Sequence, residues 1–357
     1  MLSIHHYAYE IMILAQLQIQ NLRNIHSLRF NLHPHLNIIV GPNGSGKTSF
    51  LESIYLLGSG HSFRTREITP LVRHGTDCLT VFARTHDEQS ISIQKSTSLP
   101  TQVRLNNYPC QSSSELAHFL PCQVLYQDLF QIIDAGPSVR RSLLDWGLFH
   151  VEHSYHLLWK QYRRAIKQRN SLLRQKARRA DLEPWNLTIE QLANKLDAFR
   201  SDYFVKLNNV FQTLLKKLTQ VECHLQYYKG WDKKGANKSL SAVLADSYEL
   251  DIIRQFTQYG AHHADLLIES EMYKAKQYLS RGQQKIVLIT LKLAQTLLMT
   301  TPCIFLCDDL STELDDLHLT SLFNLIHTFN GQFFVTATDK NSLPLPQNSE
   351  FFSMINL

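Results

Sequence analysis

A glycine-rich stretch between two apolar segments offers the clearest chemistry in this sequence. Residues 41–48 read G-P-N-G-S-G-K-T and match the pattern G-x-x-x-x-G-K-[ST] at every fixed position. In such a loop the glycines let the backbone wrap closely around phosphate groups, with the backbone N–H groups pointing inward. The stretch predicts a phosphate-binding loop whose candidate nucleotide-binding residues are Gly41, Pro42, Asn43, Gly44, Ser45, Gly46, Lys47 and Thr48.

Two residues of this loop have more specific expected roles. Lys47 is expected to reach the β- and γ-phosphates of a nucleoside triphosphate, and Thr48 to hold Mg²⁺. The residues before the loop, L-N-I-I-V, read as a buried strand, and the residues after it, S-F-L-E-S-I-Y-L-L, read as an amphipathic helix. Because the motif requires a strand before it and a helix after it, a chance glycine-rich turn is the weaker interpretation.

An acidic pair follows a second apolar strand pattern. Residues 303–309 read C-I-F-L-C-D-D, so a buried strand is expected to end in two aspartates. We expect Asp308 to coordinate Mg²⁺, directly or through water, and Asp309 to act catalytically by polarising the attacking water. The alternative for Asp309 is an N-cap of the helix that follows, since aspartate is favoured at that position.

A third motif opens a predicted helix late in the chain. Residues 279–285 read L-S-R-G-Q-Q-K and precede an apolar run with helical spacing. The free N–H groups and the dipole of a helix start favour negative charge, so the motif predicts a second anion site. This second anion site lies more than two hundred residues after the phosphate loop. One bound nucleotide does not explain why the chain would have two anion sites.

The bulk composition is that of a folded protein with a mild positive charge. Of 357 residues, 44% are hydrophobic and 19% are charged, and the formal net charge is +5. This charge is compatible with nucleic-acid binding without demonstrating it. The six cysteines form no C-x-x-C pair, so they indicate neither a zinc site nor a redox motif, and the expected location is a reducing cytoplasm. No apolar stretch reaches the ~20 residues that span a bilayer.

The apolar pattern predicts an α/β core that a long helical insertion divides. The helical pattern runs from about 138 to 220, with a break at Glu183-Pro184-Trp185, and helix returns from 279. A small antiparallel sheet is expected over 76–109, with a turn near Asn106. The other expected elements are strands at 13–20, 25–32, 36–40, 303–307 and 332–337 and a helix at 313–329.

The ordered set of motifs resembles the ABC-type ATPases. The phosphate loop comes first, then L-S-R-G-Q, then a strand ending in D-D, and S-T-E-L-D (311–315) follows directly. Transporter ATPases of this type have about half the distance that separates Lys47 from Ser280 here, and the chromosome-structural ATPases insert a far longer coiled coil. The motif order and spacing of this chain instead resemble those of the RecF family of bacterial DNA-gap repair proteins.

This resemblance covers nearly the whole chain from Met12. Beyond the motifs above, it rests on L-x-I-x-N-L-R-N (17–24), the continuation of the phosphate loop to S-F-R-T (62–65), A-G-P-S-V-R-R-S-L-L-D (135–145) and Y-R-R-A-I-K-Q-R-N-S-L-L-R (162–174).

The chain departs from the family pattern at three places. The family usually has phenylalanine where Leu22 stands, and G-P-H-R where residues 260–263 read G-A-H-H. T-A-T-D (336–339) lacks the histidine that most ABC ATPases carry after the last core strand. The residue that senses the γ-phosphate is therefore unassigned.

The resemblance implies a fold and a division into domains. The implied fold is α/β, an ABC-type ATPase head with a P-loop core and an antiparallel β subdomain, plus a helical insertion domain. We expect residues 12–137 and 271–357 to form the ATPase domain and 138–270 the helical domain. Residues 1–11 fit poorly with the strand pattern that follows, so we expect a disordered extension there and Met12 as the true start.

The resemblance also implies an activity: a weak, DNA-stimulated ATPase that acts as a clamp. ATP would drive formation of a homodimer, in which Ser280, Gly282 and Gln283 of one copy meet the γ-phosphate held by the other copy. The second anion site would thus be half of a shared pocket, with Arg281 facing outward or toward the partner. The clamp would bind gapped DNA or single-strand/double-strand junctions without sequence specificity. Its implied partners are RecR and RecO, and the implied result is loading of RecA onto gaps.

A basic helix is the candidate for DNA contact. Nine lysines and arginines and no acidic residue lie between Lys160 and Arg179. The candidate DNA-contacting residues are Arg163, Arg164, Lys167 and Arg169. Two alternatives are a solvated helix face and ion pairs with the neighbouring long helix. Arg140 and Arg141 could contact nucleotide or DNA, or form structural ion pairs.

Two other functions remain open at this point. One is a transport-type ATPase, which needs a membrane partner. The other is a scaffold that senses ATP and dimerises without turnover. Asp309 discriminates between the scaffold and the enzyme, because only an enzyme needs a catalytic carboxylate there.

Overall fold

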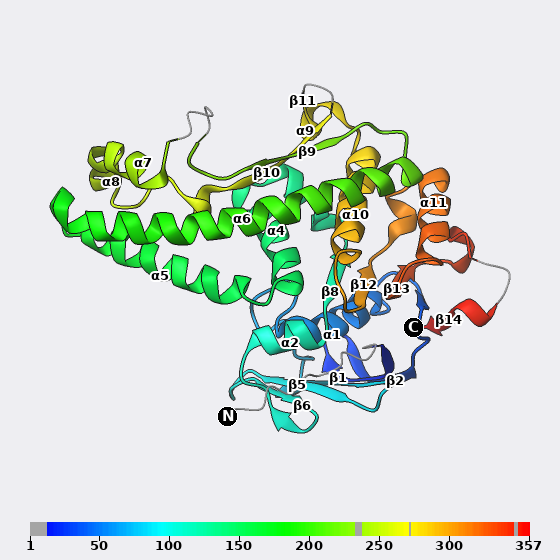
Figure 1. Ribbon diagram of the computed structural model, residues 1–357. Coiled ribbons are helices and arrows are strands. Elements are labelled where there is room, and N and C mark those ends of the chain that lie inside the picture. The colour runs from blue at the N-terminus through cyan, green and yellow to red at the C-terminus, as the bar shows by residue number, and fades with distance from the viewer. Residues whose placement is uncertain (1–12, 233–237, 271–272, 346–348) are drawn as a thin grey trace. The chain divides into compact units, whose positions relative to one another are not determined.

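The computed structural model describes residues 13–232, 238–270, 273–345 and 349–357 (Figure 1). The predicted extension and the predicted start at Met12 lie outside these residues. The contacts divide the chain into two compact units: unit 1 comprises Met1–Leu129 and Thr300–Leu357, and unit 2 comprises Phe130–Met299. This division groups residues 271–299 with the helical unit, whereas the sequence analysis assigns them to the ATPase domain. The reason is packing, because helix α10 lies against helix α6 within unit 2.

Unit 1 contains a five-stranded parallel sheet in the order β14-β3-β13-β12-β8. Its central strands are buried along almost their whole length and mainly apolar, as expected for strands that are covered on both faces. The predicted strands at 36–40 and 303–307 are confirmed at these bounds. The strands are β14 (Ser353–Asn356), β3 (Leu36–Val40), β13 (Gly331–Ala337), β12 (Cys303–Cys307) and β8 (Cys122–Leu125).

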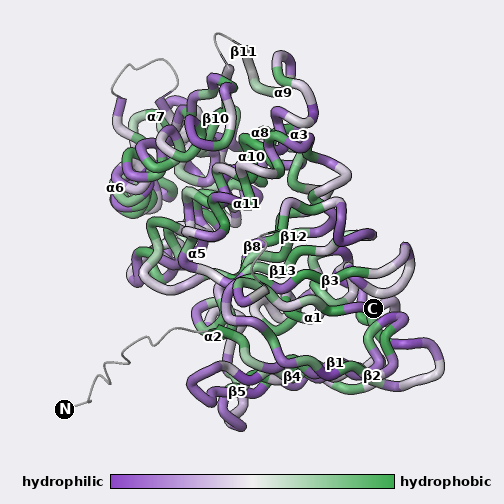
Figure 2. The backbone as a smooth tube through the Cα atoms, turned by 90° about the vertical axis from the view of Figure 1, so that its right-hand side faces the viewer, coloured by the Kyte–Doolittle hydropathy of each residue, from purple (hydrophilic) through white to green (hydrophobic). Residues whose placement is uncertain are grey.

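A second sheet in unit 1 is antiparallel and has six strands in the order β2-β1-β4-β5-β6-β7. Its strands β1 and β4 mix buried with partly exposed residues, and Figure 2 shows hydrophobic and hydrophilic residues interspersed along both. The predicted turn lies at Asn106 and Asn107, which both have positive φ. The strands are β2 (Ile25–Asn31), β1 (Leu14–Leu22), β4 (Cys78–Thr85), β5 (Ser90–Ser96), β6 (Gln102–Leu105) and β7 (Tyr108–Pro109).

Helix α1 (Lys47–Ser59) lies between the two sheets of unit 1 (Figure 1). Phe50 is fully buried, and its ring meets Phe30 of β2 at 5.9 Å and Phe334 of β13 at 6.3 Å between centroids. One side chain thus packs against both sheets, which fixes the helix that follows the phosphate loop. Unit 1 also contains α2 (Ser113–Phe119), the 3₁₀ turns η3 (Leu310–Thr312), η4 (Lys340–Ser342) and η5 (Ser349–Phe351), and α11 (Asp316–Ile326). The turn η1 (Gln127–Phe130) ends at the boundary of the two units.

Unit 2 is mainly helical, and two long helices form a hairpin in it. Helices α5 (Tyr155–Arg174) and α6 (Arg179–Leu218) lie side by side (Figure 1). The predicted break at Pro184 is wrong, because α6 runs through it. Proline lacks the backbone N–H, and at this place near the helix start only one intrahelical hydrogen bond is lost. The shorter helices are α3 (Gln131–Asp134), α4 (Pro137–Val151), α7 (Leu240–Asp246), α8 (Tyr248–Arg254), η2 (Ala261–His263), α9 (Ala275–Tyr278) and α10 (Arg281–Thr296).

A three-stranded antiparallel sheet completes unit 2, in the order β11-β10-β9. Its strands are β9 (His224–Tyr228), β10 (Asp265–Ser270) and β11 (Tyr273–Lys274). In the part of the chain that the structure describes, no helix is both long enough and apolar enough to cross a membrane.

A buried ion pair ties the helical hairpin to the segment that follows it. The guanidinium of Arg169 is fully buried and donates to Asp251 at 2.7 Å, to Asn186 at 2.8 Å and to Thr257 at 2.9 Å. Asp251 is also fully buried. These contacts join α5, α6 and α8, so the pair holds three segments that are far apart in sequence.

The residues that depart from the family pattern, 260–263, take part in a second hydrogen-bonded cluster in unit 2, in which Gly260 and Ala261 are buried. The Tyr162 hydroxyl and the His262 Nδ1 lie 2.7 Å apart, and Arg200 donates to the Ala261 carbonyl at 2.6 Å. Gly260 has φ 139°, and a Cβ there would lie 2.5 Å from the Tyr162 hydroxyl. This position therefore requires glycine, both for its backbone conformation and for the close approach of the tyrosine.

Replacing Arg169 by alanine is expected to lower the free energy of unfolding by about 3–5 kcal/mol, because Asp251 would be left buried without its counter-ion. The measurement is urea unfolding followed by circular dichroism. Arg164→Ala is the matched control, since that arginine is exposed on the same helix, and it should change the free energy by less than about 0.5 kcal/mol. Equal unfolding midpoints for the two variants would contradict a stabilising role for this pair.

Acid is expected to destabilise the fold through His262. Burial lowers the pKa of this histidine from 6.5 to about 3, so the ring stays neutral in the fold but gains a proton in the unfolded chain below pH 6.5. Because the unfolded chain then binds more protons, the free energy of unfolding should fall by about 2 kcal/mol between pH 7 and pH 5 from this residue. His262→Gln should flatten this dependence in unfolding curves, whereas replacement of the exposed His26 by glutamine should leave it unchanged.

Candidate nucleotide-binding site

The phosphate-binding loop occupies the turn between β3 and α1. Gly44 has φ 83° and Gly46 has φ 110°, a region that residues with a side chain rarely adopt. A Cβ on Gly41 would lie 2.6 Å from the Leu357 carbonyl oxygen. The loop can therefore form only with glycines at these places, and it leads directly into the N-terminus of α1. A helix N-terminus of this kind presents free N–H groups to an anion.

The ammonium of Lys47 lies across the loop. Its Nζ donates to the carbonyl of Gly41 at 2.7 Å and to that of Pro42 at 3.1 Å. The side chain is 8% exposed, so the charge is held at the loop and directed by backbone carbonyls. A phosphate group bound by the loop would meet this ammonium directly, which is the role predicted for Lys47.

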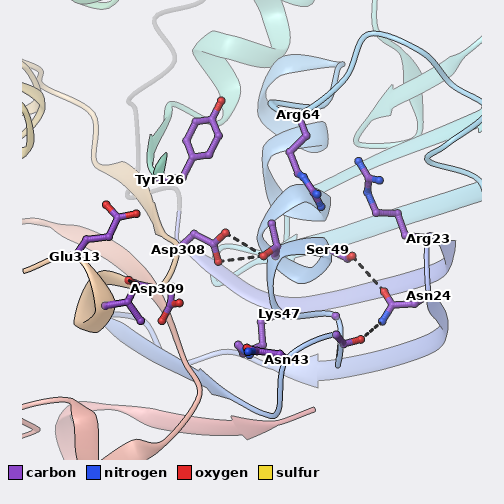
Figure 3. A pocket seen from close by; sticks show the side chains of 14 residues that line it. Arg23, Asn24, Asn43, Lys47, Ser49, Arg64, Tyr126, Asp308, Asp309 and Glu313 are labelled. Carbon is purple, nitrogen blue, oxygen red and sulfur yellow. Dashed lines mark hydrogen bonds between the residues drawn. The ribbon is translucent and has the colours of Figure 1, made fainter. Parts of the chain in front are cut away.

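Asn24 braces the loop from the turn between β1 and β2. Its Nδ2 donates to the Gly44 carbonyl at 2.9 Å, and its Oδ1 accepts from the Ser49 hydroxyl at 3.2 Å (Figure 3). A Cβ on Gly46 would lie 3.2 Å from the Asn24 amide. One amide thus connects the middle of the loop to the first turn of α1, and a larger residue at position 46 would displace it.

The first aspartate after β12 meets the threonine of the loop. The Thr48 hydroxyl lies 2.9 Å from Asp308 Oδ2 and 3.2 Å from Oδ1. The Thr336 hydroxyl of β13 donates to Asp308 Oδ1 at 2.8 Å. Strands β3, β13 and β12 are parallel neighbours, so their carboxyl ends bring these three side chains to the same edge of the sheet.

Asp309 is oriented differently from Asp308. Its backbone is left-handed with φ 51°, and its N–H donates to the Thr336 hydroxyl at 2.9 Å. Its Oδ1 is buried and has no hydrogen-bond partner among the described residues. The side chain makes no capping hydrogen bond, and the N-cap of α11 is Asp315 instead. The alternative of Asp309 as a helix cap is therefore wrong, and a buried carboxylate oxygen is left to interact with a ligand.

These residues surround a cavity of about 540 Å³. Figure 3 shows Arg23 and Arg64 on one side of α1 and Asp308, Asp309 and Glu313 on the other. A cavity of this size, with convergent cations and carboxylates, suits a small polyanionic ligand with a metal ion. Its lining residues are Arg23, Asn24, Asn43, Gly44, Gly46, Lys47, Thr48, Ser49, Arg64, Tyr126, Asp308, Asp309, Thr312 and Glu313.

The oxygen atoms of Thr48 and Asp308 fit a magnesium ion. Mg²⁺ prefers oxygen ligands and is usually bound by one or two protein groups together with phosphate oxygens. A hydroxyl and a carboxylate within hydrogen-bond distance at the end of a phosphate loop supply such a pair. The described residues contain no group of three or more His, Cys, Asp or Glu side chains that could hold a metal by themselves. A metal ion here would therefore depend on the nucleotide for its remaining ligands.

The third motif begins a helix, as predicted, but it lies in unit 2, away in sequence from the phosphate loop of unit 1. Ser280 is exposed and caps α10: its Oγ accepts from the Gln283 N–H at 3.3 Å, and its own N–H donates to Gln283 Oε1 at 2.9 Å. A Cβ on Gly282 would meet nothing within 4 Å. The cap explains Ser280 and Gln283 locally, and the role of the motif in a second copy remains a prediction.

Arg281 makes contacts within its own unit. It donates to Asp134 at 3.0 Å, and its guanidinium carbon lies 4.8 Å from the centre of the Phe130 ring. Its side chain is 64% exposed. The arginine of the motif therefore connects α10 to α3.

The four candidate DNA-contacting residues do not share one environment. Arg163, Arg164 and Lys167 are exposed on α5, and Arg163 lies over the Trp159 ring at 4.6 Å. Arg169 is fully buried in the pair with Asp251, so its prediction as a DNA contact is wrong. The spacing of basic residues along a helix did not reveal which one turns inward, because the buried carboxylate lies 82 positions away.

Arg140 is a structural ion-pair residue. It binds Asp265 with two hydrogen bonds, at 2.8 and 2.9 Å, and its neighbour Arg141 donates to the Ala264 carbonyl at 2.8 Å. Of the alternatives for these arginines, the structural role is confirmed for Arg140, because both carboxylate oxygens of Asp265 are engaged.

Several pocket residues carried no predicted role. Arg23, Asn24 and Arg64 lie in stretches on which the family resemblance rests. The sequence therefore marked these stretches as typical of the family, but it did not indicate what the three residues do. Tyr126 and Thr336 gave no signal, because a tyrosine after one strand and a threonine inside another look like ordinary sheet residues. Their roles depend on which strands are neighbours.

Comparisons with known proteins agree with this architecture. The family model described as the RecF/RecN/SMC N terminal domain matches residues 13–353. The DNA replication and repair protein RecF of Stutzerimonas stutzeri (strain A1501) is 37% identical over 342 residues, which cover 93% of this chain and 92% of that protein. RecF of Marinomonas sp. (strain MWYL1) is 37% identical over 340 residues, with 93% and 92% covered.

Solved structures give the same fold. A structure of the recombination mediator protein RecF with ATP, from the RecFOR pathway, superposes with a TM-score of 0.80 at 26% identity and covers 94% of each chain. An Smc head bound to the C-terminal winged-helix domain of ScpA superposes at 0.59 with 16% identity, covering 93% of this chain and 91% of that chain, and this likeness concerns the fold alone. The predicted fold class, an ABC-type ATPase head with a helical domain, is confirmed. The chain belongs to the RecF family of DNA replication and repair proteins.

Proposed function

We propose that this chain binds ATP with Mg²⁺ and hydrolyses it slowly as a switch in DNA repair. The observation that carries the proposal is the 2.9 Å contact between Thr48 of the phosphate loop and Asp308, with the buried Oδ1 of Asp309 on the next residue. A RecF relative solved with ATP, 26% identical to this chain, supports the choice of nucleotide.

Each residue has a distinct part in this reaction. The loop N–H groups and Lys47 would bind the phosphates, while Thr48 and Asp308 would hold Mg²⁺, which neutralises charge on the phosphate oxygens. Asp309 would take a proton from the water as the water oxygen bonds to the γ-phosphorus and the bond from that phosphorus to the bridging oxygen of ADP breaks. Its Oδ1 is suited to this, since it is buried and engaged by no other group among the described residues. A further group would complete the site at the γ-phosphate, for which the sequence analysis assigned no residue.

We propose that a second copy supplies that group. Ser280 and the Gly282 backbone of one chain would meet the γ-phosphate bound to the other, so ATP would join two chains head to tail. The N-terminus of α10 offers N–H groups, an exposed serine and open space at Gly282 for this contact. Binding of ATP would thus favour the dimer, and hydrolysis would release it.

The dimer is proposed to act on DNA at gaps or single-strand/double-strand junctions and to help load RecA. The exposed Arg163, Arg164 and Lys167 provide positive charge for backbone contact, with affinity that falls as salt rises. RecR and RecO are the proposed partners, in keeping with the RecFOR pathway named for the solved relative. DNA is proposed to stimulate hydrolysis.

Of the two alternatives, membership of the RecF family excludes a transporter-type ATPase. A scaffold that binds ATP without turnover has the same phosphate loop and differs at Asp309. A buried carboxylate oxygen with no partner among the described residues favours an enzyme, since a scaffold has no use for it.

Asp309→Asn is expected to lower DNA-stimulated ATP turnover by about 100-fold or more, because the amide cannot accept the proton of the attacking water. ATP binding and ATP-induced dimers should persist or strengthen. Phosphate release at saturating ATP is the measurement. Asp316→Asn is the matched control, since this carboxylate is exposed and lies seven positions away. If the wild type shows no hydrolysis with DNA, the scaffold is the better description.

Ser280→Arg is expected to abolish ATP-dependent dimers while leaving ATP binding by the monomer intact, because the arginine would fill the space that the γ-phosphate needs. Size-exclusion chromatography with light scattering, with and without ATP, is the measurement. Ser154→Arg is the matched control, since Ser154 is also an exposed serine at a helix start in unit 2. A Ser280 variant that dimerises like the wild type would refute the shared site.

A further inference from the structure

A buried carboxylate lies directly behind the nucleotide-binding site. Glu52 is fully buried in the second turn of α1, five residues after Lys47. It accepts hydrogen bonds from Arg23 through both Nε and Nη2, the latter at 2.8 Å, and from the Ser62 hydroxyl. A buried charge is costly unless it is paired and hydrogen-bonded, and these donors satisfy both carboxylate oxygens.

The hydrogen bonds of Glu52 form a network with two arms, and the first arm, from Glu52 to Arg23, holds Arg23 in position. This residue has φ 49°, which is uncommon for a residue with a side chain. Its N–H donates to the Leu71 carbonyl at 2.8 Å, and its guanidinium is bound by Glu52 on two atoms. Arg23 also lines the nucleotide cavity, so the pair with Glu52 determines where this cation stands at the site.

The second arm fixes the loop that carries Arg64. The Ser62 hydroxyl donates to Glu52 and accepts from the N–H groups of Arg64 at 2.9 Å and Thr65 at 3.2 Å. One hydroxyl thus joins the buried carboxylate to the backbone of Arg64. The Arg64 side chain lines the cavity, and among the described residues its guanidinium forms no hydrogen bond or ion pair.

The two arms meet at one face of the cavity. Figure 3 shows the side chains of Arg23 and Arg64 together on the side of α1 that lies away from Asp308 and Asp309. Both arginines line the same cavity and like charges repel, so they need a fixed backbone and a counter-charge. Glu52 supplies the counter-charge, because it pairs with Arg23, and it fixes the backbone of Arg64 through the Ser62 hydroxyl.

We propose that Glu52 is a positioning residue for nucleotide binding, which orders Arg23 and the loop of Arg64 so that both guanidinium groups face the phosphates held at the loop 41–48. This inference rests on the proposed nucleotide site. Glu52 does not line the cavity, so it acts through the two arginines. Without its carboxylate, both cations would lose their fixed positions, and the affinity for a polyanion would fall.

The test is the dissociation constant of a fluorescent ATP analogue with Mg²⁺, measured on the full chain. Glu52→Gln is expected to weaken binding about tenfold, because the amide presents one acceptor where the carboxylate presents two and places an N–H donor against Arg23. Ser62→Ala removes only the second arm and should weaken binding by a smaller factor. If Glu52→Gln does not fold, the nucleotide affinity of Ser62→Ala tests the inference in its place.

A double-mutant cycle separates positioning from general stability. If Glu52 acts through Arg23, Glu52→Gln should weaken binding less in an Arg23→Ala background than in the wild type. Asp265→Asn is the matched control, because Asp265 is a largely buried carboxylate that pairs with Arg140 in unit 2. It should lower the melting temperature without changing nucleotide affinity.

The outcomes distinguish the inference from the function on which it rests. A wild type that binds no ATP analogue would overturn the proposed function and the inference with it. A wild type that binds, together with folded Glu52→Gln and Ser62→Ala variants of equal affinity, would overturn the inference alone. Strictly additive effects of Glu52→Gln and Arg23→Ala would also overturn it.

Discussion

The parallel pairing of β3, β13 and β12 is the constraint on which the site depends. Parallel neighbours end at the same edge of a sheet, so the loop after β3 and the aspartates after β12 arrive together although they are distant in sequence. Thr336 of β13 lies between them and binds both Asp308 and the Asp309 N–H. Without this pairing the two motifs would be separate, and Thr48 would not meet Asp308.

Around this edge, polar side chains with several hydrogen bonds give the phosphate loop its shape. Asn24, which is itself exposed, joins Gly44 in the loop to Ser49 in α1, and the buried Glu52 binds Arg23 and Ser62. Most buried polar groups have hydrogen-bond partners, so a buried and fully paired carboxylate such as Glu52 indicates a place where the fold requires one geometry. Here the requirement is a loop and two cations held in place before a ligand binds.

The helical unit uses the same principle for a different purpose. Arg169 and Arg200 are buried among carboxylates, hydroxyls and carbonyls, and their partners come from several helices and turns. These contacts lock the helices to one another. The basic stretch that contains Arg169 therefore combines two kinds of arginine, one that holds the unit together and others that remain exposed.

Local features could be predicted from the sequence: the glycines of the loop, the apolar strand that ends in two aspartates, and the helix that opens at the L-S-R-G-Q motif. Each depends on residues close together in the chain, where spacing and backbone preference decide the outcome. Tertiary structure alone decided the features that depend on distant partners. In the folded structure, Thr336 contacts Asp308 and Asp309, and the Arg169 side chain is buried against Asp251. Helix α6 also continues through Pro184 without a break. Burial and pairing depend on neighbours that spacing along one helix does not reveal.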